Sequence, residues 1–79
     1  MDKLTVMLHD KTFNVEFSDK AMIQLLAHSL PLRKITDLIK KNSEEIIRIQ
    51  HPEVFTIVDE IAFSGTKDEK NIYIDKIIQ

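Results

Sequence analysis

The fold is decided at residues 4–17, which read LTVMLHDKTFNVEF and alternate between apolar and polar side chains on both sides of a short polar break. Alternation with a period of two is typical of strands that bury one face, so this stretch predicts a β-hairpin. The break, His9-Asp10-Lys11, contains no glycine, and we therefore expect a loop longer than the tightest mirror-image turns. The buried face of the hairpin would consist of Leu4, Val6, Leu8, Phe13, Val15 and Phe17.

Apolar residues change to helical spacing after the hairpin. Ser18 is placed to cap a helix whose first turn carries Asp19, and Pro31 is expected to end this helix and to begin the next one. Residues 32–50 fit either one continuous helix or two helices that meet at Asn42-Ser43. We favour the break, with Ser43 as the N-cap, because a serine followed by two glutamates is a helix-start signal.

The last third of the chain is predicted to hold one more helix and a final strand. The helix would follow His51-Pro52 and end at Gly65, and its apolar face would consist of Val54, Ile57, Val58, Ile61 and Ala62. β-branched and aromatic residues alternate over residues 72–78, which predicts a strand. The fold class is therefore α+β: one domain over residues 1–79, with a small antiparallel sheet (the N-terminal hairpin plus the C-terminal strand) packed against three or four short helices.

Composition limits the chemistry that this chain can perform. Its 79 residues include one glycine and no cysteine, which excludes a disulfide framework, thiol catalysis, cysteine-ligated zinc and a glycine-rich phosphate loop. The three histidines, His9, His28 and His51, lie far apart without metal-ligand spacing, and the serines fit helix ends better than a nucleophilic site. No apolar run reaches the roughly 20 residues that cross a bilayer. We therefore expect a cytoplasmic protein that is not an enzyme, with no cofactor, metal, membrane or small-molecule substrate.

Residues 32–49, LRKITDLIKKNSEEIIRI, resemble a helix–turn–helix unit, in which a second short helix enters the DNA major groove. The isoleucines have the spacing that the helix crossing requires, although Lys40 and Lys41 stand where the motif usually has glycine and an apolar residue. Residues 30–51 carry five basic and three acidic side chains within a chain of net charge −2, which mildly favours a nucleic-acid face. The resemblance implies DNA contacts from Lys40, Lys41, Ser43 and Arg48.

A protein-binding surface is the alternative that we prefer. If Phe13, Val15 and Ile74 face the helices, then Met7, Tyr73 and Ile77 face outward and offer apolar contacts to a partner. The final strand is also expected to be an exposed edge that can pair with another chain. The sequence therefore predicts a small regulatory or inhibitory module that binds a protein, which can be a second copy of itself, with DNA binding as the second choice.

Overall fold

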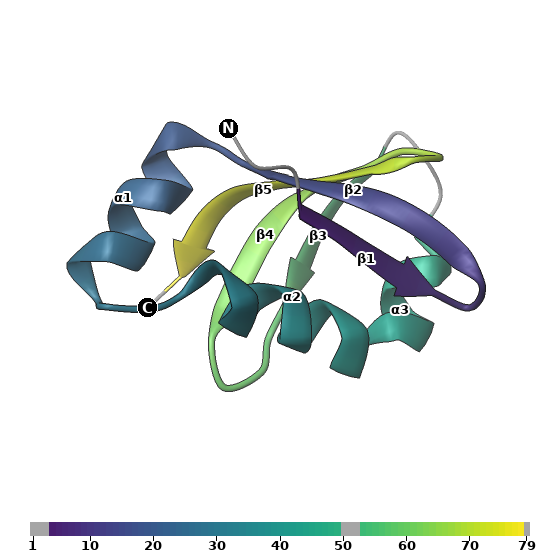
Figure 1. Ribbon diagram of the computed structural model, residues 1–79, viewed down its shortest axis with the longest axis horizontal. Coiled ribbons are helices and arrows are strands. Elements are labelled where there is room, and N and C mark those ends of the chain that lie inside the picture. The colour runs from purple at the N-terminus through teal and green to yellow at the C-terminus, as the bar shows by residue number, and fades with distance from the viewer. Residues whose placement is uncertain (1–3, 50–52, 79) are drawn as a thin grey trace.

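The computed structural model describes residues 4–49 and 53–78, which form an α+β fold (Figure 1). The described part of the chain contains one mixed sheet with the strand order β1-β2-β5-β4-β3, and α2 and α3 lie along one of its faces. The α+β class is thus confirmed, whereas the predicted sheet of three antiparallel strands is too small. The elements in chain order are β1 (Leu4–Leu8), β2 (Lys11–Phe17), α1 (Asp19–Ala27), α2 (Leu32–Lys41), α3 (Ser43–Ile47), β3 (Glu53–Ile57), β4 (Ala62–Lys67) and β5 (Asn71–Ile78).

β1 and β2 form the predicted antiparallel hairpin, in which Val6 lies opposite Phe13 and Leu8 lies opposite Lys11. The predicted long loop is wrong, because only His9 and Asp10 connect the strands, with φ angles of 50° and 69°. Two positive φ angles are the signature of a type I′ turn, whose twist matches that of the strands. Histidine and aspartate enter this backbone region more readily than most non-glycine residues, so they replace the usual glycine.

α1 begins as predicted, with the Ser18 hydroxyl accepting a hydrogen bond of 3.0 Å from the Ala21 N–H. The helix ends at Ala27, before Pro31, because Ser29 takes a left-handed conformation with a φ of 54°. A left-handed residue after the last turn is a common helix terminator. Pro31 is the N-cap of α2, whose first residue is Leu32, so the proline stands one position before the helix that it was expected to begin.

α2 and α3 are separate helices, which confirms the predicted break. The N-cap of α3 is Asn42 rather than Ser43, and Ser43 is the first residue of the helix, so the N-cap prediction for Ser43 is wrong. Asn42 Nδ2 donates to the Leu38 carbonyl at 2.8 Å and to the Asp59 carboxylate at 2.9 Å. The asparagine therefore ends α2 and ties the helix junction to the β3–β4 connection.

The prediction of a helix after His51-Pro52 is wrong, because β3 and β4 form an antiparallel hairpin there. Residues 51 and 52 themselves lie outside the described residues. Phe55 and Ile57 are buried and Val54 is exposed, which is a period of two. β-branched and aromatic residues fit a pleated sheet better than a helix. Gly65 lies in β4, where an added Cβ atom would lie 1.9 Å from the Tyr73 carbonyl oxygen, so close strand packing rather than helix capping requires glycine.

β5 lies inside the sheet, so the prediction that the final strand is an exposed edge is wrong. It pairs antiparallel with β4 and parallel with β2, which also corrects the expectation of a fully antiparallel sheet. The parallel pairing follows from the second hairpin, because the chain returns through β3 and β4 before it reaches the open edge of β2. The two edges of the described sheet are β1 and β3.

A β-bulge in β5 explains why the predicted outward orientation of Ile77 is wrong. Ser64 is in register with Lys76 and Gly65 with Ile74, so Asp75 is an extra residue on β5. One extra residue shifts the alternation of side chains by one position. Ile77 consequently points to the core and is 2% exposed.

α1 takes over as the neighbour of β5 beyond the bulge. The Ser18 hydroxyl donates to the Asp75 carbonyl. Gln24 Nε2 donates to the Ile77 carbonyl at 2.6 Å, and Gln24 Oε1 accepts from the Ile77 N–H at 3.0 Å. A side-chain amide thus completes both backbone bonds that a neighbouring strand would otherwise make.

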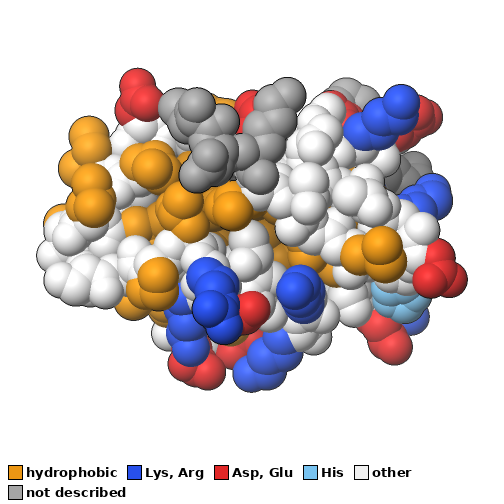
Figure 2. Space-filling model, in the orientation of Figure 1, with side chains coloured by type: hydrophobic (Ala, Val, Ile, Leu, Met, Phe, Trp, Pro, Cys, Tyr) orange, Lys and Arg blue, Asp and Glu red, His pale blue; other side chains and the backbone are white. Residues whose placement is uncertain are grey.

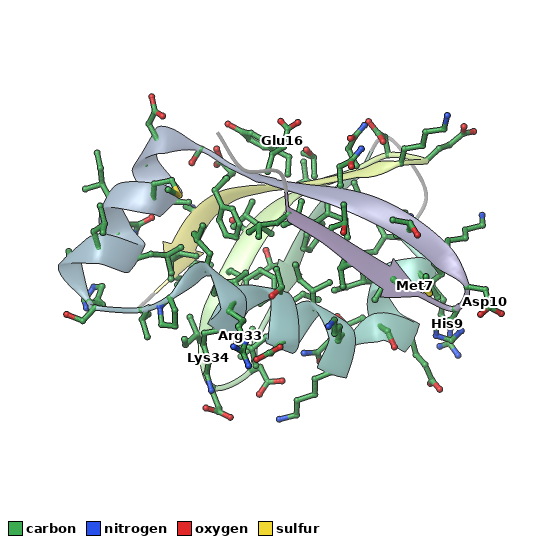
Figure 3. All side chains as sticks on the ribbon, in the orientation of Figure 1. Met7, His9, Asp10, Glu16, Arg33 and Lys34 are labelled. Carbon is green, nitrogen blue, oxygen red and sulfur yellow. The ribbon has the colours of Figure 1, made fainter. Side chains whose placement is uncertain are left out.

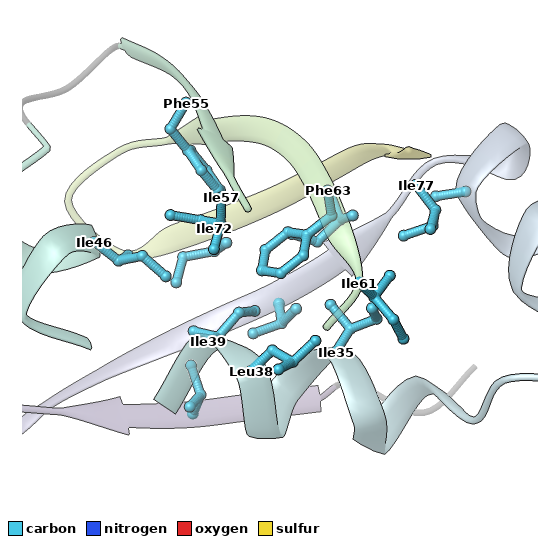
Figure 4. Close-up of a cluster of buried hydrophobic side chains, with 14 of the residues drawn as sticks. Ile35, Leu38, Ile39, Ile46, Phe55, Ile57, Ile61, Phe63, Ile72 and Ile77 are labelled. Atoms are coloured by element: carbon cyan, nitrogen blue, oxygen red, sulfur yellow. The ribbon is translucent and has the colours of Figure 1, made fainter. Parts of the chain in front are cut away.

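The core lies between the helix-bearing face of the sheet and the apolar side of α2 and α3 (Figure 4). The predicted burial of Phe13, Val15 and Ile74 is confirmed, whereas Leu4 and Phe17 are only partly buried. The rings of Phe55 and Phe63 meet edge to face, with centroids 6.5 Å apart. The helices contribute Ile35, Leu38, Ile39 and Ile46, and the strands contribute Ile57, Phe63, Ile72 and Ile77.

Candidate interaction surface

The second face of the sheet, which we call the open face, presents side chains to solvent. A row of paired residues crosses it from β3 to β2, with Val54 opposite Thr66, Thr66 opposite Tyr73, and Tyr73 opposite Glu16. Along β3, Thr56 is exposed and Val54 is 74% exposed, and Val58, directly after the strand, is 81% exposed. We call the part of the open face at the β3 edge the β3 surface; it consists of Val54, Thr56, Val58, Thr66 and Tyr73.

The structure separates the three residues predicted to bind a partner. Tyr73 is 38% exposed and lies within the β3 surface, and Ile77 is in the core. Met7 is 63% exposed but lies on the opposite edge strand, next to the His9–Asp10 turn (Figure 3). Of the three residues, only Tyr73 therefore belongs to the β3 surface.

Sequence reasoning missed Val54, Thr56 and Val58 as surface residues, because the segment was assigned to a helix. The signal that could have found them is the run VFTIV over residues 54–58, in which every residue favours a strand. Read with a period of two, the same run separates a buried Phe55 and Ile57 from the exposed positions.

The basic residues predicted to contact DNA are divided between solvent and local ion pairs. Lys40 and Arg48 are exposed, and Ser43 is half-buried at the start of a helix of five residues. Lys41 Nζ lies 3.2 Å from Asp59 Oδ1. The helix α1 packs against β5 and β2. DNA binding stays a prediction.

Two ion pairs join α2 to the connection between β3 and β4. In addition to Lys41–Asp59, Lys34 Nζ lies 2.8 Å from Glu60 Oε2; Lys34 and its neighbour Arg33 are labelled on α2 in Figure 3. Hydrogen bonds from the Asn42 side chain, the Glu60 N–H and Lys41 lower the pKa of Asp59 to about 2. The hydrogen bond with Lys34 likewise lowers the pKa of Glu60. These cations thus have a structural role in holding the second hairpin to α2.

Lys67 is a buried cation on the helix-bearing face, where it is 7% exposed. Its Nζ atom donates to the Ile49 carbonyl at 3.0 Å and lies 5.2 Å from the centroid of the Phe13 ring. Burial, followed by the nearby charge of Lys11, lowers the pKa of the Lys67 ammonium. The alternation of β4 places this residue inward, and its long aliphatic stem covers the edge of the core.

An apolar concavity of about 830 Å³ lies between α1, the end of β2 and the start of α2. Hydrophobic side chains gather in this region in Figure 2. Its rim also carries Asn14, Glu16, Asp19 and Asn71. The apolar lining consists of Leu4, Val15, Phe17, Met22, Ile23 and Leu32.

Residues 4–49 and 53–78 contain no group of three or more histidine, aspartate or glutamate side chains arranged to hold a metal ion. Within the same residues, no helix has the length and apolar character needed to cross a membrane. The chain matches no protein-family model, no curated protein and no solved structure.

Proposed function

We propose that this chain is a small non-enzymatic module that regulates or inhibits a partner protein by binding it through the β3 surface. The observation that carries the proposal is the exposure of Val54, at 74%, on an edge strand of the sheet, and of Val58, at 81%, directly after that strand. We also propose a cytoplasmic location, as expected from the sequence.

An edge strand offers a row of backbone donors and acceptors that another strand can use. Proteins that remain free in solution commonly protect such edges with charged side chains, proline or a bulge, and residues 54–58 contain none of these residues. β-branched side chains on both sides of Thr56 would pack against cross-strand neighbours on an added strand. These features support a partner that adds an extended segment to β3 and covers its open-face side chains.

Tyr73 extends this surface inward by two strands, through Thr66. Aromatic side chains with an apolar ring and a polar tip frequently carry a large share of the binding energy of an interface. We therefore assign Tyr73 as the anchor of the β3 surface and expect Tyr73→Ala to weaken partner binding at least tenfold.

Affinity capture from the source cells, with nuclease added throughout, tests the proposal. One variant carries Val54→Lys and Val58→Lys, and its matched control carries Thr5→Lys and Thr12→Lys on the open face near the β1 edge. Both variants gain two positive charges at exposed positions, one pair at the β3 edge and the other on the β1–β2 hairpin, so the control accounts for the effect of added charge. We expect the β3 variant to lose its protein partners and the control to keep them. Equal capture by the two variants, with both folded by circular dichroism, would contradict the proposal.

A further inference from the structure

We infer that β3 pairs antiparallel with β3 of a second copy of this chain, with Thr56 on the two-fold axis. This inference rests on the proposed function, because it names the partner of the β3 edge; Tyr73, two strands inward on β5, lies outside the pairing. The pairing would join two sheets edge to edge into one continuous sheet.

The strand is complementary to itself when Thr56 faces Thr56 of the second copy. Val54 then lies opposite Val58, and Phe55 lies opposite Ile57, so every apolar residue meets another one. The open-face residues of one copy extend the open face of the other, and the buried residues extend the core side. A shift of one residue would exchange the two faces, and a shift of two would put Val54 or Val58 against threonine.

Charge at the ends of the strand is compatible with this register. No charged residue occurs within residues 54–58. The register places Asp59 of each copy just beyond the paired residues, and Asp59 is already paired with Lys41 at 3.2 Å. The Lys41 side chain is 61% exposed, and its ammonium group offsets the charge of the Asp59 carboxylate. We therefore expect Lys41→Ala to weaken the dimer severalfold.

The second edge strand is less available. β1 packs against both β2 and α2, whereas β4 is the one extensive neighbour of β3 among the described elements. The open-face side chains of β1 include Thr5 and the single apolar Met7, while Thr56 of β3 is flanked symmetrically by Val54 and by Val58, which directly follows the strand. A strand pair of this length is at the small end of specific interfaces, so we expect a dissociation constant on the order of 10–100 µM.

Cysteine crosslinking tests the register directly, because the chain has no cysteine of its own. Cα atoms of directly opposed antiparallel residues lie about 4.5–5.5 Å apart, a separation that a disulfide can span. Under mild oxidation, Thr56→Cys should form a covalent dimer rapidly. Mixed Val54→Cys and Val58→Cys proteins should crosslink to each other at least tenfold faster than either protein crosslinks to itself. Thr5→Cys, an exposed threonine on the other edge strand, is the matched control and should react slowly.

Sedimentation equilibrium from 10 µM to 1 mM supplies the independent measurement. We expect the wild type to dimerise and the Val54→Lys, Val58→Lys variant to stay monomeric and folded. A monomeric wild type at 1 mM, or a Thr5→Cys protein that crosslinks as fast as Thr56→Cys, would overturn the inference. If that monomeric wild type still captured another protein through Val54 and Val58, the proposed function would stand and only the second copy would be excluded. A β3 dimer that captures no other protein would support the inference and refute the regulatory role.

Discussion

Gln24 holds the end of β5 with two hydrogen bonds, and its removal should cost more than the loss of an ordinary half-buried side chain. The Gln24 amide donates to the Ile77 carbonyl at 2.6 Å and accepts from the Ile77 N–H at 3.0 Å. Methionine has a similar length and a similar helix propensity, but it offers no partner to either group. Gln24→Met therefore isolates the two hydrogen bonds.

The expected loss follows from the burial of Ile77, which is 2% exposed. Leaving a buried backbone group without a partner costs about 1–3 kcal/mol. Two such groups would cost about 2–6 kcal/mol, and since Gln24 itself is half-buried, water can compensate part of this. We expect Gln24→Met to lower the free energy of unfolding by about 2–4 kcal/mol, which corresponds to a decrease in Tm of about 10–25 °C.

Urea and thermal unfolding followed by circular dichroism measure this loss. Lys20→Met is the control, because Lys20 is an exposed residue of the same helix and its change should stay within about 0.5 kcal/mol. If Gln24→Met costs no more than Lys20→Met, the two hydrogen bonds do not hold β5 and the reasoning is refuted.

Gln24→Glu adds a test with a defined sign. A protonated glutamic acid can make both bonds, whereas the ionised carboxylate has no proton to donate to the Ile77 carbonyl. The pKa of this residue in the folded variant should therefore rise above the unfolded value of about 4.3. A raised folded pKa means that the stabilisation is complete below about pH 4.3 and is lost as the pH rises through the folded value. Relative to the wild type, the variant should be more stable at pH 4 than at pH 7.

Four further predictions follow from other contacts. Gly65→Ala places a Cβ atom 1.9 Å from a carbonyl oxygen of β5, and we expect a loss of about 3 kcal/mol or more in urea unfolding; a loss under about 1 kcal/mol would contradict the close approach. Asp10→Gly relieves a φ of 69° and should raise the free energy of unfolding by about 0.5–1 kcal/mol, whereas a destabilised variant would argue against the mirror-image turn. The pKa of Asp59 is lowered to about 2, so the carboxylate stabilises the fold above its ordinary pKa of 3.8, and this stabilisation is lost as the pH falls toward 2. In Asp59→Asn, the free energy of unfolding should therefore decrease less steeply with falling pH in that range, and an unchanged pH dependence would count against this role. For DNA binding, a gel shift at physiological salt should show no specific complex, and a salt-sensitive complex lost on Lys40→Glu and Lys41→Glu would favour the DNA-binding function instead.

Local patterns in the sequence determined the first half of the fold. The alternation over residues 4–17 sets the hairpin, and the Ser18 hydroxyl caps α1 within three residues of its own position. The separation of α2 from α3 also follows from local residue preferences around Asn42. In each case the deciding interaction lies between residues that are close in the sequence, so one segment holds the necessary information.

The candidate site was predicted in part from the same kind of pattern. The alternation that exposes Tyr73 on β5 depends only on residues near it, and the exposure of Met7 likewise follows from the hairpin. The exposure of Val54 and Val58 was not predicted, because their segment fits a helix with a period near 3.6 as well as a strand with a period of two. A short apolar segment that fits both periods adopts the structure that its tertiary contacts stabilise. Here, pairing with β4 and burial of Phe55 and Ile57 in the core stabilise a strand.

Tertiary structure alone decided the position and the facing of β5. The sequence shows that residues 72–78 favour a strand, but the order of strands depends on β3 and β4, which give β5 an antiparallel neighbour in addition to β2. The burial of Ile77 depends on a bulge at Asp75, and that bulge is fixed by contacts with residues more than fifty positions away, Ser18 and Gln24. An alternation rule uses only adjacent residues. It therefore cannot predict a one-residue change in side-chain alternation that depends on contacts with α1, which is distant in the sequence.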